Sequence, residues 1–205
     1  MKDGMFRTGT FLFIVAAISG ILLAFTQSLT APVIAQNQLN AEIKAQNDVL
    51  PSKVFADITS TKDGKTLNYK VGFDNKDQIT GAVFKVSPKG FGGIINIIVG
   101  INADGKVMNY KILSLNETPG LGNKLKSKEF ESKMLALLTS DKNPVFKVKK
   151  DGGDVDAITA ATISSRAFCT GIREAQENFN LFKDEILSAK VPASSQVPQT
   201  QGGNQ

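Results

Sequence analysis

The chain has 205 residues, with 24 Lys and Arg against 19 Asp and Glu, 41% hydrophobic residues and a formal net charge of +5. It contains no His, no Trp and a single Cys, which excludes a Ser-His-Asp triad, a His-ligated metal, a Cys-rich zinc or iron–sulfur site and an intramolecular disulfide. The positive charge is spread along the chain, whereas a nucleic-acid-binding surface needs a clustered basic face.

An apolar segment occupies the N-terminal part of the chain. From Thr8 to Ala41 there is no ionisable side chain, and Phe11 to Leu29 is mostly Phe, Leu, Ile, Val and Ala. About 20 helical residues cross a bilayer core of about 30 Å, which predicts an N-terminal segment at 1–9 and a transmembrane helix at 10–30. A cleaved signal peptide is the alternative, with Val33-Ile34-Ala35 as an imperfect cleavage site, but the length of the apolar run favours an uncleaved anchor.

The charges on either side of this segment predict its orientation. Lys2 and Arg7 precede it against one acidic residue, Asp3, whereas Glu42 is the first charged residue that follows it. The positive-inside rule therefore places the N-terminus in the cytoplasm and exports the rest of the chain in a single pass.

A second helical pattern follows the apolar segment. Pro32 comes first, apolar residues then recur at roughly helical spacing from Val33 to Leu50, and Pro51 ends the pattern. We expect a stalk helix at 31–51 that carries the chain from the membrane to a folded domain.

Alternating and apolar runs predict the strands of an antiparallel sheet. Leu67 to Phe73 alternates with a period of two, and Ile79 to Val86 is a second strand. Ile94 to Ile101 is almost entirely apolar, which is typical of a strand covered on both faces. Asn102-Ala103-Asp104-Gly105 carries turn residues and would join this strand to Lys106 to Leu115 as a β-hairpin.

The second half of the chain adds helices. Ser127 to Leu138 places its apolar residues on one helical stripe, Val145 to Val148 is a short strand, and Ile163 to Leu187 is one long helix or two. From 190 to 205 Pro, Ser, Gln, Gly and Asn dominate, which predicts a disordered tail. The predicted fold class is α+β: an exported domain at 52–189 with an antiparallel sheet flanked by helices, behind a single N-terminal transmembrane helix.

Two glycine-containing segments combine turn residues with possible ligand contacts. Lys89-Gly90-Phe91-Gly92-Gly93 is either a simple turn or a place where the backbone approaches a ligand closely. Within Asn116 to Asn123, Pro119-Gly120 supplies a turn, but a turn alone does not need the polar and apolar residues around it. Such a loop offers polar side chains, backbone N–H groups and one apolar face to a planar ligand.

A third segment, Asp154 to Arg166, is rich in hydroxyl and small side chains. A helix start capped by Ser or Thr is one interpretation. A cap needs one hydroxyl, whereas four lie here, and the small Ala160 and Ala161 leave space beside them. Unpaired N–H groups and the helix dipole favour an anion at a helix start, so a phosphate site is the other interpretation.

Taken in order, these three segments resemble the FMN-binding domain family and, within it, the G subunits of the Rnf ion-translocating electron-transport complexes. The matching stretches are Gly90-Phe91-Gly92-Gly93, Glu117-Thr118-Pro119-Gly120-Leu121-Gly122 and Asp156-Ala157-Ile158-Thr159-Ala160-Ala161-Thr162-Ile163-Ser164-Ser165. The resemblance extends from the N-terminal segment to about residue 187. It implies one membrane helix carrying a flavin domain on the extracytoplasmic (periplasmic) side of a bacterial cytoplasmic membrane.

The resemblance also implies covalent FMN on Thr162. In this family a dedicated flavin transferase joins the FMN phosphate to a threonine hydroxyl, and it recognises an Asp, a Ser or Thr and the acceptor, here Asp156, Thr159 and Thr162. Ala160 stands where the family usually has Gly, a departure that bears on the backbone fit. The N–H groups after Thr162 and the guanidinium of Arg166 would stabilise the charge of the phosphodiester.

By the same resemblance, the loop at 117–122 lies along the isoalloxazine ring, with Thr118 bonding its polar edge and Leu121 packing on it. The implied cofactor-binding residues are Glu117, Thr118, Gly120, Leu121, Gly122, Thr159, Ala160, Ala161, Thr162, Ile163, Ser164 and Ser165. No residue is assigned as a general acid, a general base or a metal ligand, because the cofactor carries the redox chemistry. Cys169 is expected to be a buried structural thiol.

The implied function is an electron relay. FMN on this subunit would pass electrons while the complex transfers them between ferredoxin and NAD and moves Na⁺ or H⁺ outward. The implied partners are the other membrane, iron–sulfur and flavin subunits and the flavin transferase, and the enzyme activity would belong to the complex. Two alternatives stay open: the C subunit of the Na⁺-pumping NADH:quinone oxidoreductase, which tends to be longer, and an anchored non-redox ligand-binding module.

Overall fold

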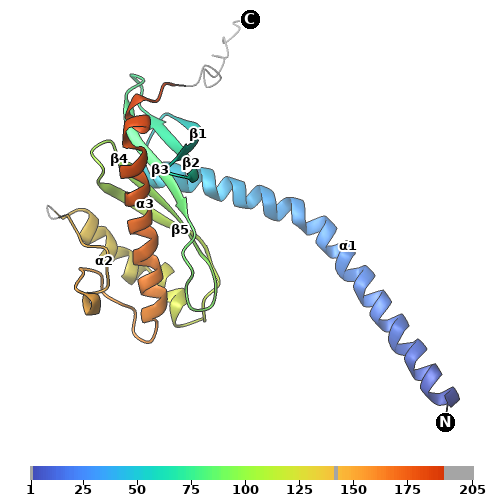
Figure 1. The fold of residues 1–205 in the computed structure, drawn as a ribbon. Helices are drawn as coiled ribbons and strands as arrows, with labels where there is room; N and C mark the ends of the chain where they lie inside the picture. The colour runs from blue at the N-terminus through green and yellow to red at the C-terminus, as the bar shows by residue number, and fades with distance from the viewer. Residues whose placement is uncertain (1, 141–142, 192–205) are drawn as a thin grey trace, which may run out of the picture. The chain divides into compact units, whose positions relative to one another are not determined.

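The computed structural model describes residues 2–140 and 143–191 (Figure 1). The chain forms two compact units, one ending at Ile43 and the other beginning at Lys44.

Helix α1, Lys2–Val49, contains the apolar segment. It is long and apolar enough to cross a membrane, and its most apolar stretch is not buried within the part of the chain that the structure describes. Large side chains such as those of Phe11, Leu23 and Leu29 are exposed along it. Pro32 lies inside the helix without ending it, so the ranges expected for a transmembrane helix and a stalk helix are continuous. The boundary between those two ranges stays a prediction.

The second unit is built on a five-stranded antiparallel sheet of order β1-β2-β3-β4-β5 (Figure 1). Its strands are β1 Val54–Lys62, β2 Lys65–Phe73, β3 Ile79–Val86, β4 Ile95–Asn102 and β5 Val107–Leu115. Each strand pairs with the next along the chain, so the sheet is a simple meander. The predicted strands β2 to β5 and the α+β class are confirmed.

Strand β1 was not predicted from the sequence. It pairs with β2 along its whole length, from Val54 opposite Phe73 to Lys62 opposite Lys65. Asp63 and Gly64 form the connection, with φ of 51° and 75°. Two consecutive residues with positive φ match the twist of a tight hairpin, for which Asp-Gly is a favoured pair.

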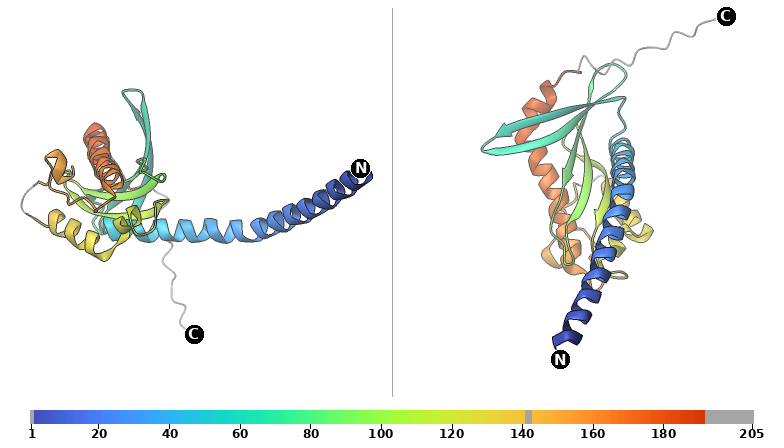
Figure 2. Two further views of the ribbon diagram at one scale, coloured as in Figure 1. Left: turned by 90° about the horizontal axis from the view of Figure 1, so that it is seen from below. Right: turned by 90° about the vertical axis from the view of Figure 1, so that its right-hand side faces the viewer.

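Helix α3, Thr162–Ser188, covers one face of the sheet by packing on β3 and β4 (Figure 2). This settles the choice between one helix and two. The core it forms with the sheet contains Phe84, Ile97, Val99, Ile101, Phe168, Ile172, Phe179 and Phe182. Each large apolar side chain buried in this way contributes about 1.5–3 kcal/mol. The α3–sheet layer is therefore the main stabilising element of the unit.

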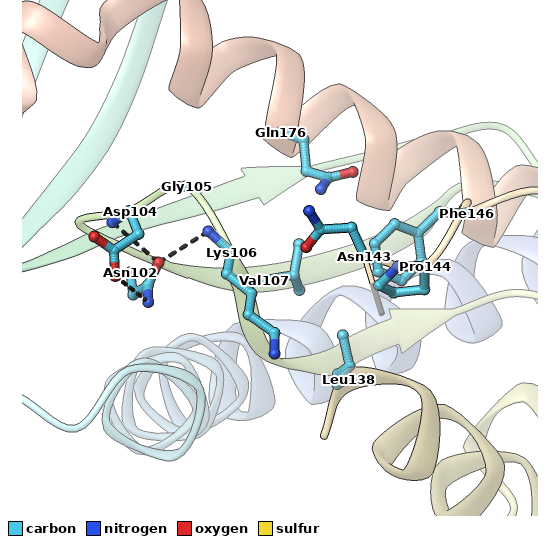
Figure 3. Close-up of a pocket in the computed structure, with 10 residues that line it drawn as sticks. All are labelled: Asn102, Asp104, Gly105, Lys106, Val107, Leu138, Asn143, Pro144, Phe146 and Gln176. Atoms are coloured by element: carbon cyan, nitrogen blue, oxygen red, sulfur yellow. Dashed lines mark hydrogen bonds between the residues drawn. The ribbon is translucent and has the colours of Figure 1, made fainter. Parts of the chain in front are cut away.

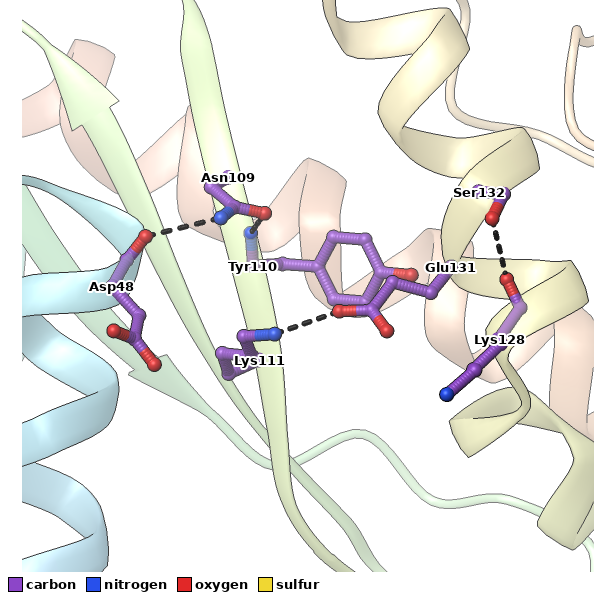
Figure 4. Close-up of polar contacts among 7 residues, drawn as sticks. All are labelled: Asp48, Asn109, Tyr110, Lys111, Lys128, Glu131 and Ser132. Carbon is purple, nitrogen blue, oxygen red and sulfur yellow. Dashed lines mark hydrogen bonds and ion pairs between the residues drawn. The ribbon is translucent and has the colours of Figure 1, made fainter.

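The last turn of α1 packs on the opposite face of the sheet. Ala45, Val49 and Leu50 form a second small core with Val83 and Ile98. The contact is close at Gly100, where a Cβ atom would lie 2.2 Å from the backbone oxygen of Val49. The amide of Asn109 on β5 also donates to the backbone oxygen of Asp48 at 3.0 Å (Figure 4).

Helix α2, Lys128–Leu138, follows the short 3-10 helix η1, Gly122–Lys126. Ser127 caps α2 by accepting a hydrogen bond from the backbone N–H of Phe130 at 3.2 Å. Lys111 of β5 donates to Glu131 of α2 at 2.7 Å, which links the helix to the edge of the sheet (Figure 4).

The short strand predicted at Val145 to Val148 is wrong. Outside the sheet, Val148 makes only an isolated bridge with Val155, beside the 3-10 helix η2, Lys149–Asp151. The carboxylate of Asp154 accepts from the N–H of Val145 at 2.7 Å, which folds the segment back as a loop. Phe146 and Val148 are buried in the main core whereas Val145 is exposed, so burial of alternate residues imitated the pattern of a strand. In the predicted tail, Lys190 and Val191 have no regular structure, and 192–205 lie outside the described residues.

Candidate functional site

The three segments singled out in the sequence meet around one cavity of about 390 Å³. The described residues that line it are Phe91, Glu117, Thr118, Leu121, Gly122, Ala160, Ala161, Thr162, Ile163 and Ser164. This set contains every implied cofactor-binding residue except Gly120, Thr159 and Ser165. It adds Phe91, which belongs to the first glycine segment but was given no site role from the sequence.

Thr162 begins helix α3 at the wall of this cavity. The residue before it, Ala161, is the N-cap and has no side-chain oxygen, so a Ser or Thr cap, the first interpretation of this segment, is wrong. The backbone N–H groups of a first helical turn have no acceptor within the helix. Together with the helix dipole, they make this end of α3 suited to hold a phosphate next to the Thr162 hydroxyl.

Ala160 adopts the left-handed conformation that normally belongs to glycine, with φ of 60°. It sits in a tight turn closed by a hydrogen bond from the N–H of Ala161 to the oxygen of Ile158 at 2.9 Å. Ser165 braces the turn, because its hydroxyl accepts from the N–H of Ile158 and donates to the oxygen of Ala161, both at 3.0 Å. The left-handed φ is the physical reason why glycine suits this position and why alanine is strained there.

The loop at 117–122 is shaped by Pro119-Gly120. Gly120 has φ of 77°, and the N–H of Leu121 donates to the oxygen of Thr118 at 3.1 Å, as expected for a turn with Pro and Gly at its centre. The turn places Thr118 and Leu121 at the cavity, while Gly120 serves the turn itself.

The carboxylate of Glu117 points at protein groups from both other segments. Its Oε2 accepts from the hydroxyl of Ser164 at 2.8 Å, and its Oε1 accepts from the backbone N–H of Gly92 at 3.2 Å. A Cβ atom at Gly90 would lie 2.0 Å from Oε1, and one at Gly122 would lie 2.5 Å from Oε2. A side chain at either glycine would therefore push the carboxylate away from its present position.

Arg166 does not line the cavity among the described residues. Its Nε and Nη2 atoms donate to the two carboxylate oxygens of Asp151 at 2.7 and 2.8 Å. This hydrogen bonding lowers the pKa of Asp151 and raises the pKa of Arg166. In this structure Arg166 forms a bidentate ion pair with Asp151 of η2, and its role beside the phosphate stays a prediction.

Asp156 and Thr159, which were expected to be read by the transferase, are both exposed outside the cavity. Asp156 pairs with Lys149 at 2.7 Å, and that hydrogen bond lowers the pKa of Asp156. Their position on the surface suits recognition by another protein, and their role as a recognition signal stays a prediction.

Cys169 lies in α3 and is buried in the main core. Burial raises the pKa of its thiol to about 12, so the side chain is neutral at ordinary pH. The expectation of a buried thiol is confirmed.

A second cavity, of about 440 Å³, lies beside the turn between β4 and β5 (Figure 3). One of its polar side chains serves the turn itself, because the side-chain oxygen of Asn102 accepts from the N–H groups of Asp104 and Lys106 at 3.1 and 2.8 Å. None of the residues singled out in the three segments lines it. Although it is the larger of the two, it is not the candidate site.

The first cavity has the chemistry that a flavin mononucleotide needs. The Thr162 hydroxyl lies at the start of α3, where first-turn N–H groups have no acceptor within the helix and suit a phosphate. Phe91, Leu121 and Ile163, which are 70%, 39% and 52% exposed, place apolar surface around the cavity for a planar ring. Exposed apolar side chains that gather at a cavity are typical of a ligand site.

Comparison with known proteins gives matches over most of the chain. The FMN-binding domain model matches residues 90–177, which include all three segments, and the RnfG N-terminal region model matches residues 1–49. The G subunit of the ion-translocating oxidoreductase complex of Shewanella piezotolerans is 32% identical over 213 residues, covering 96% of this chain and 99% of that protein. The G subunit of the proton-translocating ferredoxin:NAD(+) oxidoreductase complex of Clostridium ljungdahlii is 34% identical over 182 residues, covering 88% of this chain and 95% of that protein.

One solved structure, that of Shewanella oneidensis NqrC, is similar with a TM-score of 0.44 and 18% sequence identity. The similarity covers 69% of this chain and 73% of that chain.

Proposed function

Since the chain belongs to the family of G subunits of ion-translocating oxidoreductase complexes and contains an FMN-binding domain, we propose that it is the membrane-anchored flavoprotein that relays electrons within such a complex. The observation that carries this proposal is the meeting of three separate segments at one cavity, with Thr162 at the first turn of α3.

Thr162 is the proposed attachment point of the cofactor. A flavin transferase would form the bond between the Thr162 oxygen and the phosphorus of an activated flavin nucleotide, while the bond to the departing nucleotide breaks and the hydroxyl proton is released. The diester keeps one negative charge, which the first-turn N–H groups of α3 stabilise. The bound FMN supplies the electron transfer, and the residues of the chain hold and orient it.

The other cavity residues are proposed to hold the isoalloxazine ring. Leu121, Phe91 and Ile163 contribute apolar surface for the ring, and Thr118 contributes a hydroxyl for its polar edge. A covalent link removes the dissociation equilibrium, which suits a domain on the side of the membrane that holds little free FMN. Helix α1 is the proposed anchor, with the N-terminus in the cytoplasm and the FMN domain on the periplasmic side of the cytoplasmic membrane.

The proposed reaction belongs to the whole complex. Electrons pass between reduced ferredoxin and NAD, and Na⁺ or H⁺ moves outward. Relatives named as G subunits align with nearly all of this chain, which favours this assignment over a subunit of the NADH:quinone oxidoreductase. The match to the FMN-binding domain favours a redox role over a non-redox ligand-binding module.

The proposal is tested in membranes of the native host that carry Thr162→Ala in place of the natural chain. We expect the complex to assemble and to lose NAD reduction by reduced ferredoxin. The control is Thr170→Ala, an exposed threonine two turns further along α3, which should leave the reaction unchanged. Full electron transfer in Thr162→Ala membranes would refute the relay at this residue.

A further inference from the structure

Glu117 links the three segments that form the cavity. It belongs to the loop at 117–122, accepts from Gly92 of the glycine-rich loop at 3.2 Å, and accepts from Ser164 in the first turn of α3 at 2.8 Å. The two bonds span 25 and 47 residues of sequence. No local turn explains contacts of that separation.

Protein groups from three segments surround the carboxylate closely. Gly90 and Gly122 come so close to its two oxygens that a Cβ at either position would clash with them. Ser164 is buried, with 1% of its surface exposed. A buried hydroxyl needs a partner, and hydrogen bonds to a charged acceptor are the stronger kind.

We infer that Glu117 is a positioning residue, which ties the glycine-rich loop, the loop at 117–122 and the start of α3 into one cavity and places a negative charge at the cavity wall. The inference rests on the proposed function, because it takes the cavity as the flavin site. The Gly92 N–H and the Ser164 hydroxyl both donate to the carboxylate, as its ionised form requires.

The negative charge of Glu117 should also affect the reduction potential of the bound flavin, which packing alone would not do. Two-electron reduction with uptake of one proton adds one negative charge to a flavin, and an anion in the wall of a partly closed site opposes that added charge. Glu117 should therefore hold the reduction potential of the bound flavin lower than a neutral side chain of the same shape would.

Two substitutions separate the positioning role from the charge. In Glu117→Gln the amide oxygen accepts from Gly92, and the amide nitrogen donates to the Ser164 hydroxyl, so the shape is kept while the charge is lost. In Glu117→Ala both contacts are lost. Glu129→Gln is the matched control, because it removes the same charge from an exposed residue that does not line the cavity.

The experiment uses the full-length chain produced together with an active flavin transferase. The extent and rate of flavin attachment are measured by intact mass, and the potential by titration followed through the flavin absorbance. We expect Glu117→Gln to load flavin within about twofold of the unmodified sequence and to shift the reduced-to-oxidised ratio at a fixed potential about tenfold toward reduced, which is about 30 mV for two electrons. We expect Glu117→Ala to load at least about tenfold more slowly, and Glu129→Gln to change neither quantity.

An unchanged potential in Glu117→Gln, or normal loading in Glu117→Ala, would overturn the inference. If Glu117→Ala does not accumulate as folded protein, Ser164→Ala takes its place, and a normal loading rate in that variant has the same meaning. Failure of the unsubstituted chain to acquire flavin would instead count against the proposed function. The two failures are thus distinguishable.

Discussion

Replacement of Ala160 by glycine should stabilise the protein, although it removes a side chain. Ala160 has φ of 60°, in the left-handed region where a Cβ atom is unfavourable. That conformation costs a non-glycine residue about 1–2 kcal/mol. Glycine also gives the unfolded chain more conformational freedom, and this offsets about 0.4–1 kcal/mol of the stabilisation gained by relieving the strain. The net expectation is a gain of about 0.5–1 kcal/mol, or about 1–4 °C in Tm for a chain of this size.

The measurement is thermal unfolding of the full-length Ala160→Gly protein in detergent, followed by circular dichroism. The matched control is Gly64→Ala in the β1–β2 turn, where φ is 75° and a Cβ would meet nothing within 4 Å. That control makes the reverse change in the same kind of backbone, so it should lower the Tm by a similar amount. If Ala160→Gly lowers the Tm while the control also lowers it as expected, the conclusion that Ala160 is strained is wrong.

Three further predictions concern close packing and burial. Gly100→Ala should destabilise the domain by roughly 1–3 kcal/mol in urea unfolding, because its Cβ would lie 2.2 Å from the backbone oxygen of Val49; an unchanged midpoint would contradict this. Gly122→Ala should slow flavin attachment, measured by intact mass, because its Cβ would displace the carboxylate of Glu117; loading at the normal rate would argue against that contact. Cys169, with a pKa of about 12, should have about one thiol in ten thousand ionised at pH 8 and should react with iodoacetamide only after unfolding; rapid labelling of the folded protein would contradict its burial.

The buried Cys169 thiol also makes the free energy of unfolding depend on pH. The pKa of Cys169 is higher in the folded chain than the value of about 8.5 for a free thiol. Its contribution to stability is therefore fully present below about pH 8.5 and is lost progressively as the pH rises from there toward about 12. Cys169→Ala should flatten the decline of the unfolding free energy over that range, and an unchanged slope would show that other groups cause it.

Local pattern was enough to predict much of the fold. The alternation in β2 and the apolar run in β4 reflect which faces are covered, and both are visible in the residues themselves. Strand β1 was missed because Thr, Ser and Asp interrupt its apolar pattern, as expected for a strand at the edge of the sheet. The Asp63-Gly64 pair was the available signal, since it is a favoured hairpin turn.

The site was predictable as a set of segments but not as an arrangement. Turn residues, hydroxyl side chains and then resemblance to a family identified the three stretches, and the structure brings them to one cavity. The link from Glu117 to Ser164 joins residues 47 positions apart, so no local rule reveals it. The left-handed backbone at Ala160 was hidden for another reason, because alanine gives no sign of the positive φ that a glycine would have suggested.

Covalent flavin on Thr162 is tested most directly by the intact mass of the full-length chain produced with an active flavin transferase, followed by fragment mapping across residues 154–173. We predict a gain equal to FMN less one water, located on Thr162 and absent from Thr162→Ala. An unmodified mass, when the same transferase modifies a known substrate protein, would contradict the attachment. So would a gain of that mass located on another residue, such as Thr159.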